Sequence, residues 1–190
     1  MRICYQRVKI LGLMLAAGLF SNQALSQQQS TATAATQAIV VMPIVITKST
    51  DLSFGRLVSV VGTVNISAVD GARTSTNSAN LITTLGTTNA PGRATFTVAG
   101  EPGLVYDISA AEPEITLANS SNSALLTVTL TGVHVLSTSA TGTAATATSG
   151  TLSTEGSDTL GIGGSLTLAE GTPSGTYANP AGISLTVNYN

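Results

Sequence analysis

The sequence predicts an all-β protein, folded as a single immunoglobulin-like antiparallel β-sandwich of about seven to nine strands. Three observations lead to this prediction. Nearly every apolar stretch alternates apolar with polar residues, which is the period of a half-buried strand. Clusters of Gly, Pro, Asn and Asp separate these stretches and supply the bends that turns need. No segment beyond the N-terminal leader carries a helical stripe.

Residues 1–26 have the layout of a secretory signal peptide. The basic stretch "MRICYQRVK" precedes the apolar stretch "ILGLMLAAGLF", and small residues at Ala24 and Ser26 offer a cleavage site before Gln27. No stretch approaches the roughly 20 apolar residues that a membrane span needs. Cys4, the only cysteine, lies inside this leader. We therefore expect an exported protein of bacterial type without a disulfide, in the periplasm, on the cell surface or outside the cell.

Residues 27–42 form an extended N-terminal segment that precedes the domain predicted for residues 43–190. Small polar residues pass into "AIVVMPIVI", the most apolar run after the leader. Pro43 lies in this run, so the run is an edge strand or is divided in two. Two interpretations stay open. The segment is a flexible leader before the first strand, or it completes the sheet of a neighbouring molecule by strand addition.

The strands then follow in order along the chain. Gly132 breaks the phase before "VHVL" and predicts a bulge. The low-complexity stretch at residues 139–158 is expected to be a long exposed loop. Alternating strand patterns are centred on residues 64–66, 94–98, 104–108, 126–130 and 166–168. Phe54, Phe96, Tyr106 and Tyr189 are expected to be the large core residues, each contributing about 2–3 kcal/mol through burial.

The final stretch "GISLTVNYN" places Ile183, Leu185, Val187 and Tyr189 on one face of a strand. A chain end that is tied into a sheet is unusual, because ends usually fray. We therefore expect this end to be held or recognised by something.

Charge excludes some classes of partner. After the leader is removed, four basic residues stand against nine acidic ones, so the net charge is 4 − 9 = −5. Four scattered cations do not form the cluster that phosphate binding needs, so nucleic acid is not an expected partner. An outer-membrane barrel is also not expected, because aromatic residues are few and the alternating runs are short.

We predict no catalytic, cofactor-binding or metal-binding residues, and therefore no enzyme. His134 is the only histidine and is expected to face solvent between two inward valines. No G-x-S-x-G turn presents a serine. Glu112 and Glu114 flank Pro113 and are interpreted as solvated charges at a turn. The stretch "DGARTSTN" lacks the ligand pattern of a calcium loop, and "GIGGS" precedes no helix that could cradle a phosphate.

Four stretches carry a family resemblance. They are "ITKSTDLSFGRL", "GTVNIS" with the following "GAR", "GRATFTVAGEPGLVYDIS" and "GGSLTLAEGTPSGTYANPAGISLTVNYN". Together they resemble a family of exported bacterial β-domains catalogued as domain of unknown function 4402, over roughly residues 43–190. The close of the sequence is also similar to chaperone–usher fimbrial subunits and to spore-coat-U-type domains.

The second resemblance implies an incomplete sandwich that a partner strand completes. In fimbrial subunits, a periplasmic chaperone pairs with the last strand, and an extension of the next subunit later replaces it. By this resemblance, Leu185, Val187, Tyr189 and Asn190 would form the edge that the chaperone contacts. Residues 27–42 would be the donor strand, with Ile39, Val41 and Met42 as its large side chains. Unlike many fimbrial subunits, this chain has no cysteine pair.

We therefore expect a pilin-like structural or adhesive surface subunit that assembles by donor-strand exchange. Its partners would be other copies or related subunits, together with a periplasmic chaperone. The alternative is a self-contained monomeric sandwich that binds a glycan or matrix partner through Thr- and Ser-rich loops. A hydrolase that uses His134 ranks far behind both.

Overall fold

The computed structural model describes residues 30–82, 89–110, 112–136 and 146–190. The chain divides into two compact units, Met1–Ile39 and Val40–Asn190. In the first unit, the described residues 30–39 are exposed and form neither helix nor strand. The predicted signal peptide lies outside the described residues. Within the described part of the chain, no helix is long and apolar enough to cross a membrane.

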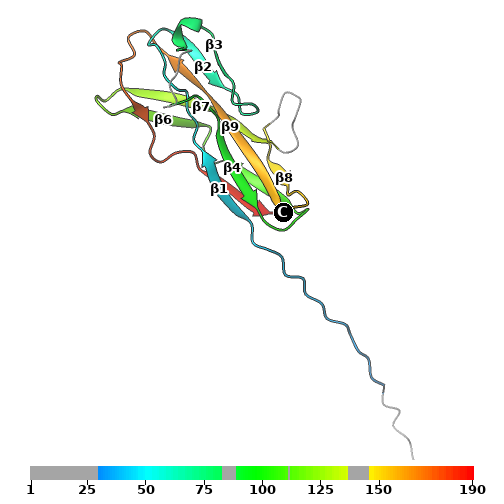
Figure 1. Ribbon diagram of the computed structural model, residues 1–190. Coiled ribbons are helices and arrows are strands. Elements are labelled where there is room, and N and C mark those ends of the chain that lie inside the picture. The colour runs from blue at the N-terminus through cyan, green and yellow to red at the C-terminus, as the bar shows by residue number, and fades with distance from the viewer. Residues whose placement is uncertain (1–29, 83–88, 111, 137–145) are drawn as a thin grey trace, which may run out of the picture. The chain divides into compact units, whose positions relative to one another are not determined.

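The second unit is built from antiparallel strands in two sheets (Figure 1). The larger sheet has the order β1-β4-β9-β7-β6-β10, with β2 paired to one half of β9 and β3 paired to β2. Its strands are β1 (Val45–Thr50), β2 (Gly62–Ile66), β3 (Arg73–Ser75), β4 (Ala94–Ala99), β6 (Glu114–Asn119), β7 (Leu125–Val135), β9 (Ser157–Leu168) and β10 (Tyr177–Ala178).

The smaller sheet has the order β11-β5-β8. Its strands are β5 (Val105–Ala110), β8 (Ser149–Thr151) and β11 (Leu185–Tyr189). One 3-10 turn, η1 (Ser78–Asn80), interrupts the strands and is capped by the Asn77 side chain, which accepts a hydrogen bond from the Ala79 amide. The all-β sandwich is confirmed. Of the eleven described strands, β3, β8 and β10 have three residues or fewer, so the longer strands fall within the predicted number.

Two core clusters lie on the larger sheet. The first lies between the sheets and includes Phe96 of β4, Tyr106 of β5 and Val187 of β11. The second cluster contains Phe54, Val64, Ile66, Val128 and Leu166, and none of its members comes from β5, β8 or β11. The smaller sheet therefore covers only one part of the larger sheet, and the second cluster relies on loops for its cover.

Phe54, Phe96 and Tyr106 are buried, as predicted. Tyr189 is only partly buried, although it packs against the first core cluster. Its ring therefore belongs to the core, while its hydroxyl remains available for contacts at the domain's edge.

The predicted bulge at Gly132 is present. The register between β7 and β9 shifts between Leu130 and Val133, and Gly132 has a φ of 81°. The prediction that His134 faces solvent is wrong, because His134 is only 6% exposed. His134 stands opposite Gly161 of β9, and a Cβ at Gly161 would meet the Ala68 carbonyl. The chain that follows β2 therefore covers this part of the outer face, where a strand pattern alone predicts water.

The expected long loop at residues 139–158 is also partly wrong. Residues 137–145 lie outside the described residues. Beyond them, β8 pairs with β5, and Leu152 joins the first core cluster. The sequence did not predict this strand, because a stretch of Ser, Gly and Thr shows no apolar alternation.

Candidate functional site

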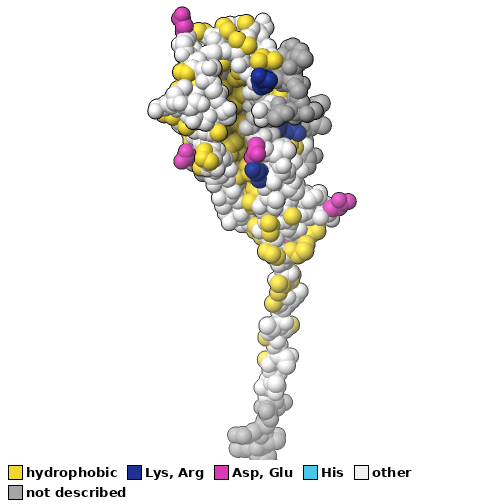
Figure 2. Space-filling view, turned by 60° about the vertical axis from the view of Figure 1, so that its left-hand side comes forward, with side chains coloured by type: hydrophobic (Ala, Val, Ile, Leu, Met, Phe, Trp, Pro, Cys, Tyr) yellow, Lys and Arg dark blue, Asp and Glu magenta, His cyan; other side chains and the backbone are white. Residues whose placement is uncertain are grey.

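An open groove of about 960 Å³ crosses one face of the second unit. Two segments of chain form its walls: residues 48–59, which include the end of β1, and residues 172–183, which lead into β11. Figure 2 shows hydrophobic side chains gathered in a hollow on this face. The floor consists of apolar side chains from the larger sheet, namely Ala94, Ile115, Leu117, Leu126, Val128, Leu166 and Leu168.

Most of the floor belongs to the second core cluster, which the smaller sheet leaves uncovered. Val128 and Leu166 are buried, whereas Ile115, Leu117 and Leu126 are only partly buried. Sequence analysis did not single out Ile115 and Leu117. Their alternation in "EITLAN" could have identified β6 as a strand. It could not have shown that they lie under an open face.

One wall of the groove ends at Ile183, just before β11, which is an edge strand. Within the described residues, β11 pairs with β5 alone. The Asn190 amide donates to the Val105 carbonyl at 3.2 Å, and hydrogen-bonded positions recur at every second residue of an antiparallel pair. Asn188 and Thr186 therefore share this orientation toward β5. The amides and carbonyls of Leu185, Val187 and Tyr189 point to the opposite edge, which faces the side where β1 lies.

The side chains of these same residues point into the sandwich. Val187 is buried, and Leu185 and Tyr189 pack against the first core cluster. The sequence-predicted contact residues therefore form one edge: their side chains are used by the core, and the main-chain groups of Leu185, Val187 and Tyr189 are directed outward. Asn190 follows with its amide bonded to Val105.

Tyr189 also joins three parts of the chain. Its hydroxyl accepts a hydrogen bond from the Glu101 amide at 2.6 Å and donates one to the Met42 carbonyl at 2.9 Å. The Glu101 carboxylate in turn accepts a hydrogen bond from the Met42 amide at 3.1 Å. Gly100 makes room for this arrangement, because a Cβ there would meet the Tyr189 hydroxyl. Met42 is therefore fixed to the domain just before β1.

Of the predicted donor residues, Ile39 belongs to the first unit, and Val41 and Met42 belong to the second. All three are exposed, as is Val40 between them, with a relative exposure of 93%. Residues 27–29 lie outside the described residues. An uninterrupted run of large exposed apolar side chains is costly in water, so this run is suited to burial against another surface.

Charges are confined to the groove's wall. Lys48 and Asp51 form an exposed ion pair at 2.6 Å, and Arg56 lies on the same wall. An exposed pair of this kind contributes at most about 1 kcal/mol. The floor carries no charged residue, so the groove favours an apolar, uncharged occupant.

The most buried polar pair of the sandwich is structural. The Tyr106 hydroxyl donates to the Asp158 carboxylate at 2.6 Å inside the core. Burial, followed by this hydrogen bond, raises the pKa of Tyr106 above its ordinary value. The Ser67 hydroxyl and the Ala72 amide lower the pKa of Asp70, whose carboxylate accepts the Ala72 amide across the turn at Gly71. Among the described residues, no group of three His, Cys, Asp or Glu side chains could hold a metal ion.

Comparisons with known proteins give one match. A family model described as "Domain of unknown function (DUF4402)" matches residues 44–189. No curated protein and no solved structure matches this chain.

Proposed function

This chain belongs to the family described as domain of unknown function (DUF4402), and from its open groove and the free edge of β11 we propose that it is an exported, pilin-like structural subunit of a surface fibre. Subunits assemble when an extended segment of a neighbouring copy enters the groove and pairs with the free edge of β11. The mechanism is strand addition: main-chain hydrogen bonds give affinity, and alternate side chains fill the groove.

The observation that carries the proposal is the combination of an edge strand with an open apolar floor. A free strand edge is a template for another strand, and proteins normally cover or charge such an edge. Here Leu185, Val187 and Tyr189 present their main-chain groups at the edge, and the adjoining groove exposes Ile115, Leu117 and Leu126. A strand placed between β1 and β11 would satisfy both needs together.

The segment before Met42 has the properties of the donor. No charged residue occurs between Gln27 and Thr47, so the segment could enter an apolar groove without burying a charge. It also contains neither Gly nor Pro before Pro43. Residues 30–41, if extended, span about 40 Å, which matches the length of a 12-residue strand such as β9.

A chaperone is the second proposed partner. An uncovered groove of this kind would aggregate or pair with the wrong strand before assembly. A periplasmic chaperone that occupied the edge formed by Leu185, Val187, Tyr189 and Asn190 would prevent this. The proposed location is therefore the periplasm during assembly and the cell surface afterwards.

The test is a gel of protein sheared from cells, run with and without boiling in detergent. We expect a ladder of oligomers that collapses to a monomer on boiling, and no ladder when residues 27–42 are deleted. Far-ultraviolet circular dichroism would check that the deleted variant keeps its strands. A single monomer band in the unboiled lane of the intact protein would contradict the proposal and favour the self-contained binding module.

A further inference from the structure

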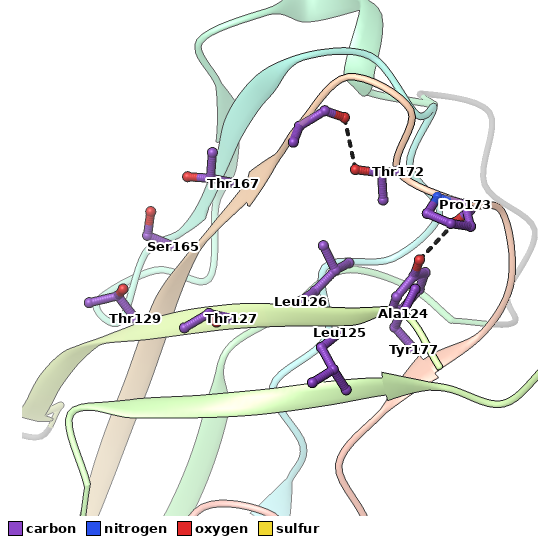
Figure 3. A pocket seen from close by; sticks show the side chains of 11 residues that line it. Ala124, Leu125, Leu126, Thr127, Thr129, Ser165, Thr167, Thr172, Pro173 and Tyr177 are labelled. Carbon is purple, nitrogen blue, oxygen red and sulfur yellow. Dashed lines mark hydrogen bonds between the residues drawn. The ribbon is translucent and has the colours of Figure 1, made fainter. Parts of the chain in front are cut away.

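A second pocket, of about 380 Å³, lies beside the loop that connects β9 to β10 (Figure 3). Most of its residues come from the outer face of β7 and β9 and from the loop, and Leu126 of the groove floor and Tyr177 of β10 complete it. Leu125 at its border is exposed. The lining consists of Ala124, Leu125, Leu126, Thr127, Thr129, Ser165, Thr167, Ala169, Thr172, Pro173 and Tyr177.

One side of this pocket is a patch of hydroxyl groups. Thr129 stands directly opposite Ser165 in the β7–β9 register, and Thr127 and Thr167 flank this pair along the two strands. In a sheet such hydroxyls recur at about 7 Å along a strand and about 5 Å between strands. Figure 3 shows these four side chains grouped on one side of the pocket.

The hydroxyls keep hydrogen-bonding capacity for a ligand. Thr129 donates to the Glu114 carboxylate at 3.3 Å, and Thr167 shares a hydrogen bond with Thr63 at 3.0 Å. A hydroxyl offers one donor and two acceptor positions, so each of these groups is only partly used.

The other side of the pocket is apolar and held in place. The Tyr177 hydroxyl donates to the Pro173 carbonyl at 2.8 Å, and the Thr172 hydroxyl donates to the Ala169 carbonyl at 2.8 Å. These two bonds, drawn in Figure 3, fix the loop and hold Tyr177 close to Pro173 on this side of the pocket. An aromatic ring with a bonded hydroxyl offers a rigid apolar surface.

Among the residues that the structure describes, no charged side chain lines the pocket. We infer that it binds a neutral oligosaccharide. A pyranose ring has an apolar face of C–H groups and a rim of hydroxyls, which match the two sides of this pocket. The volume falls within the range of small-molecule sites. This site would make the surface subunit adhesive, and it shares Leu126, Thr172, Pro173 and Tyr177 with the floor and wall of the groove.

The test is a nuclear magnetic resonance titration of the whole exported chain with lactose, cellobiose and diacetylchitobiose, and with sialyllactose as the charged counterpart of lactose. We expect at least one neutral sugar to give saturable shifts at Thr127, Thr129, Ser165 and Tyr177. Ser165→Ala and Thr127→Val should each weaken its binding about fivefold. Thr47→Val, which removes an exposed hydroxyl from β1, is the matched control and should leave binding unchanged.

Tyr177→Ala should abolish saturable binding. Because this variant also loosens the loop, the two hydroxyl variants carry the decision if Tyr177→Ala unfolds. The absence of saturable shifts with all three neutral sugars would overturn the inference. So would stronger binding of sialyllactose than of lactose, or a loss in Thr47→Val equal to that in Ser165→Ala. Gels of the sheared protein report polymerisation separately, so failure of one proposal does not imply failure of the other.

Discussion

Tyr189 shows how one side chain can serve both the core and the domain's edge. Its ring packs on the first core cluster, while its hydroxyl bonds to Glu101 and Met42. This residue therefore fixes the point at which the proposed donor segment leaves the domain. A phenylalanine would keep the ring and remove both hydrogen bonds.

We expect Tyr189→Phe to lower the free energy of unfolding by about 1–3 kcal/mol, because two hydrogen bonds are lost and the Glu101 amide loses its acceptor. Urea denaturation measures this loss. Tyr177→Phe is the matched control, since its single hydrogen bond is exposed, and its change should stay within about 0.5 kcal/mol. Equal losses in the two variants would contradict the role given to the Tyr189 hydroxyl.

The hydrogen-bonded pair of Tyr106 and Asp158 should make the folded protein less stable at alkaline pH. Burial and the Asp158 carboxylate raise the pKa of Tyr106 above the ordinary value of 10.0. Above about pH 10, the unfolded chain loses this proton while the folded chain keeps it, so stability falls as pH rises. The slope for one such group is about 1.4 kcal/mol per pH unit.

Tyr106→Phe should remove this part of the slope and lower the free energy of unfolding at neutral pH by about 1–3 kcal/mol, because the buried carboxylate loses a donor. Urea denaturation of both proteins between about pH 8 and pH 11 measures the two effects. An unchanged alkaline slope in the variant would show that Tyr106 does not set the limit.

At the scale of the element, the bulge in β7 decides which face each residue takes. Gly132 has a φ of 81°, and a Cβ there would also meet the side chain of Thr146. The bulge brings Val133 into the core and turns His134 to the opposite face. A strand without it would place the following side chains on the wrong faces.

Gly132→Ala should therefore lower the free energy of unfolding by more than backbone strain alone. Gly171 has a φ of 76°, and a Cβ added there would meet no other atom, so Gly171→Ala isolates the strain, at about 1 kcal/mol. Gly132→Ala should cost at least about 1 kcal/mol more because of the contact with Thr146. Thermal and urea unfolding of the two variants would measure the difference, and equal costs would show that Thr146 moves aside freely.

At the scale of the whole molecule, the two sheets are unequal, and this inequality creates the groove. The larger sheet carries two core clusters, and the smaller sheet covers one of them. A partner strand beside β11 would extend the smaller sheet over the second cluster. Each large side chain that it buried would contribute about 1.5–3 kcal/mol.

Ile115→Lys tests the groove without altering its edge. A lysine on the partly buried floor would place a charge where the donor side chains must lie, so the ladder of sheared oligomers should disappear. Val61→Lys is the matched control, because Val61 is exposed and lies outside the groove's lining. Circular dichroism would confirm that both variants fold, and a normal ladder in a folded Ile115→Lys protein would contradict the proposed docking.

The sequence by itself determined the strand class, most of the inward faces and the bulge. Alternation placed Val64, Ile66, Phe96 and Tyr106 correctly, because a strand's two faces follow directly from residue parity. It failed at His134, because a segment distant in sequence covers the outer face of the sheet there. It also failed at Leu152, which follows β8, a strand whose residues show no apolar alternation.

Only the tertiary structure decided where the sandwich is open. The alternation of residues along β6 shows that Ile115 and Leu117 share a face. It does not show whether another strand covers that face. The same holds for the free edge of β11, because the alternation in its own residues shows its two faces and does not show which strands lie beside it. The groove exists because the smaller sheet does not extend over the second core cluster. The extent of each sheet depends on pairings between segments far apart in the chain.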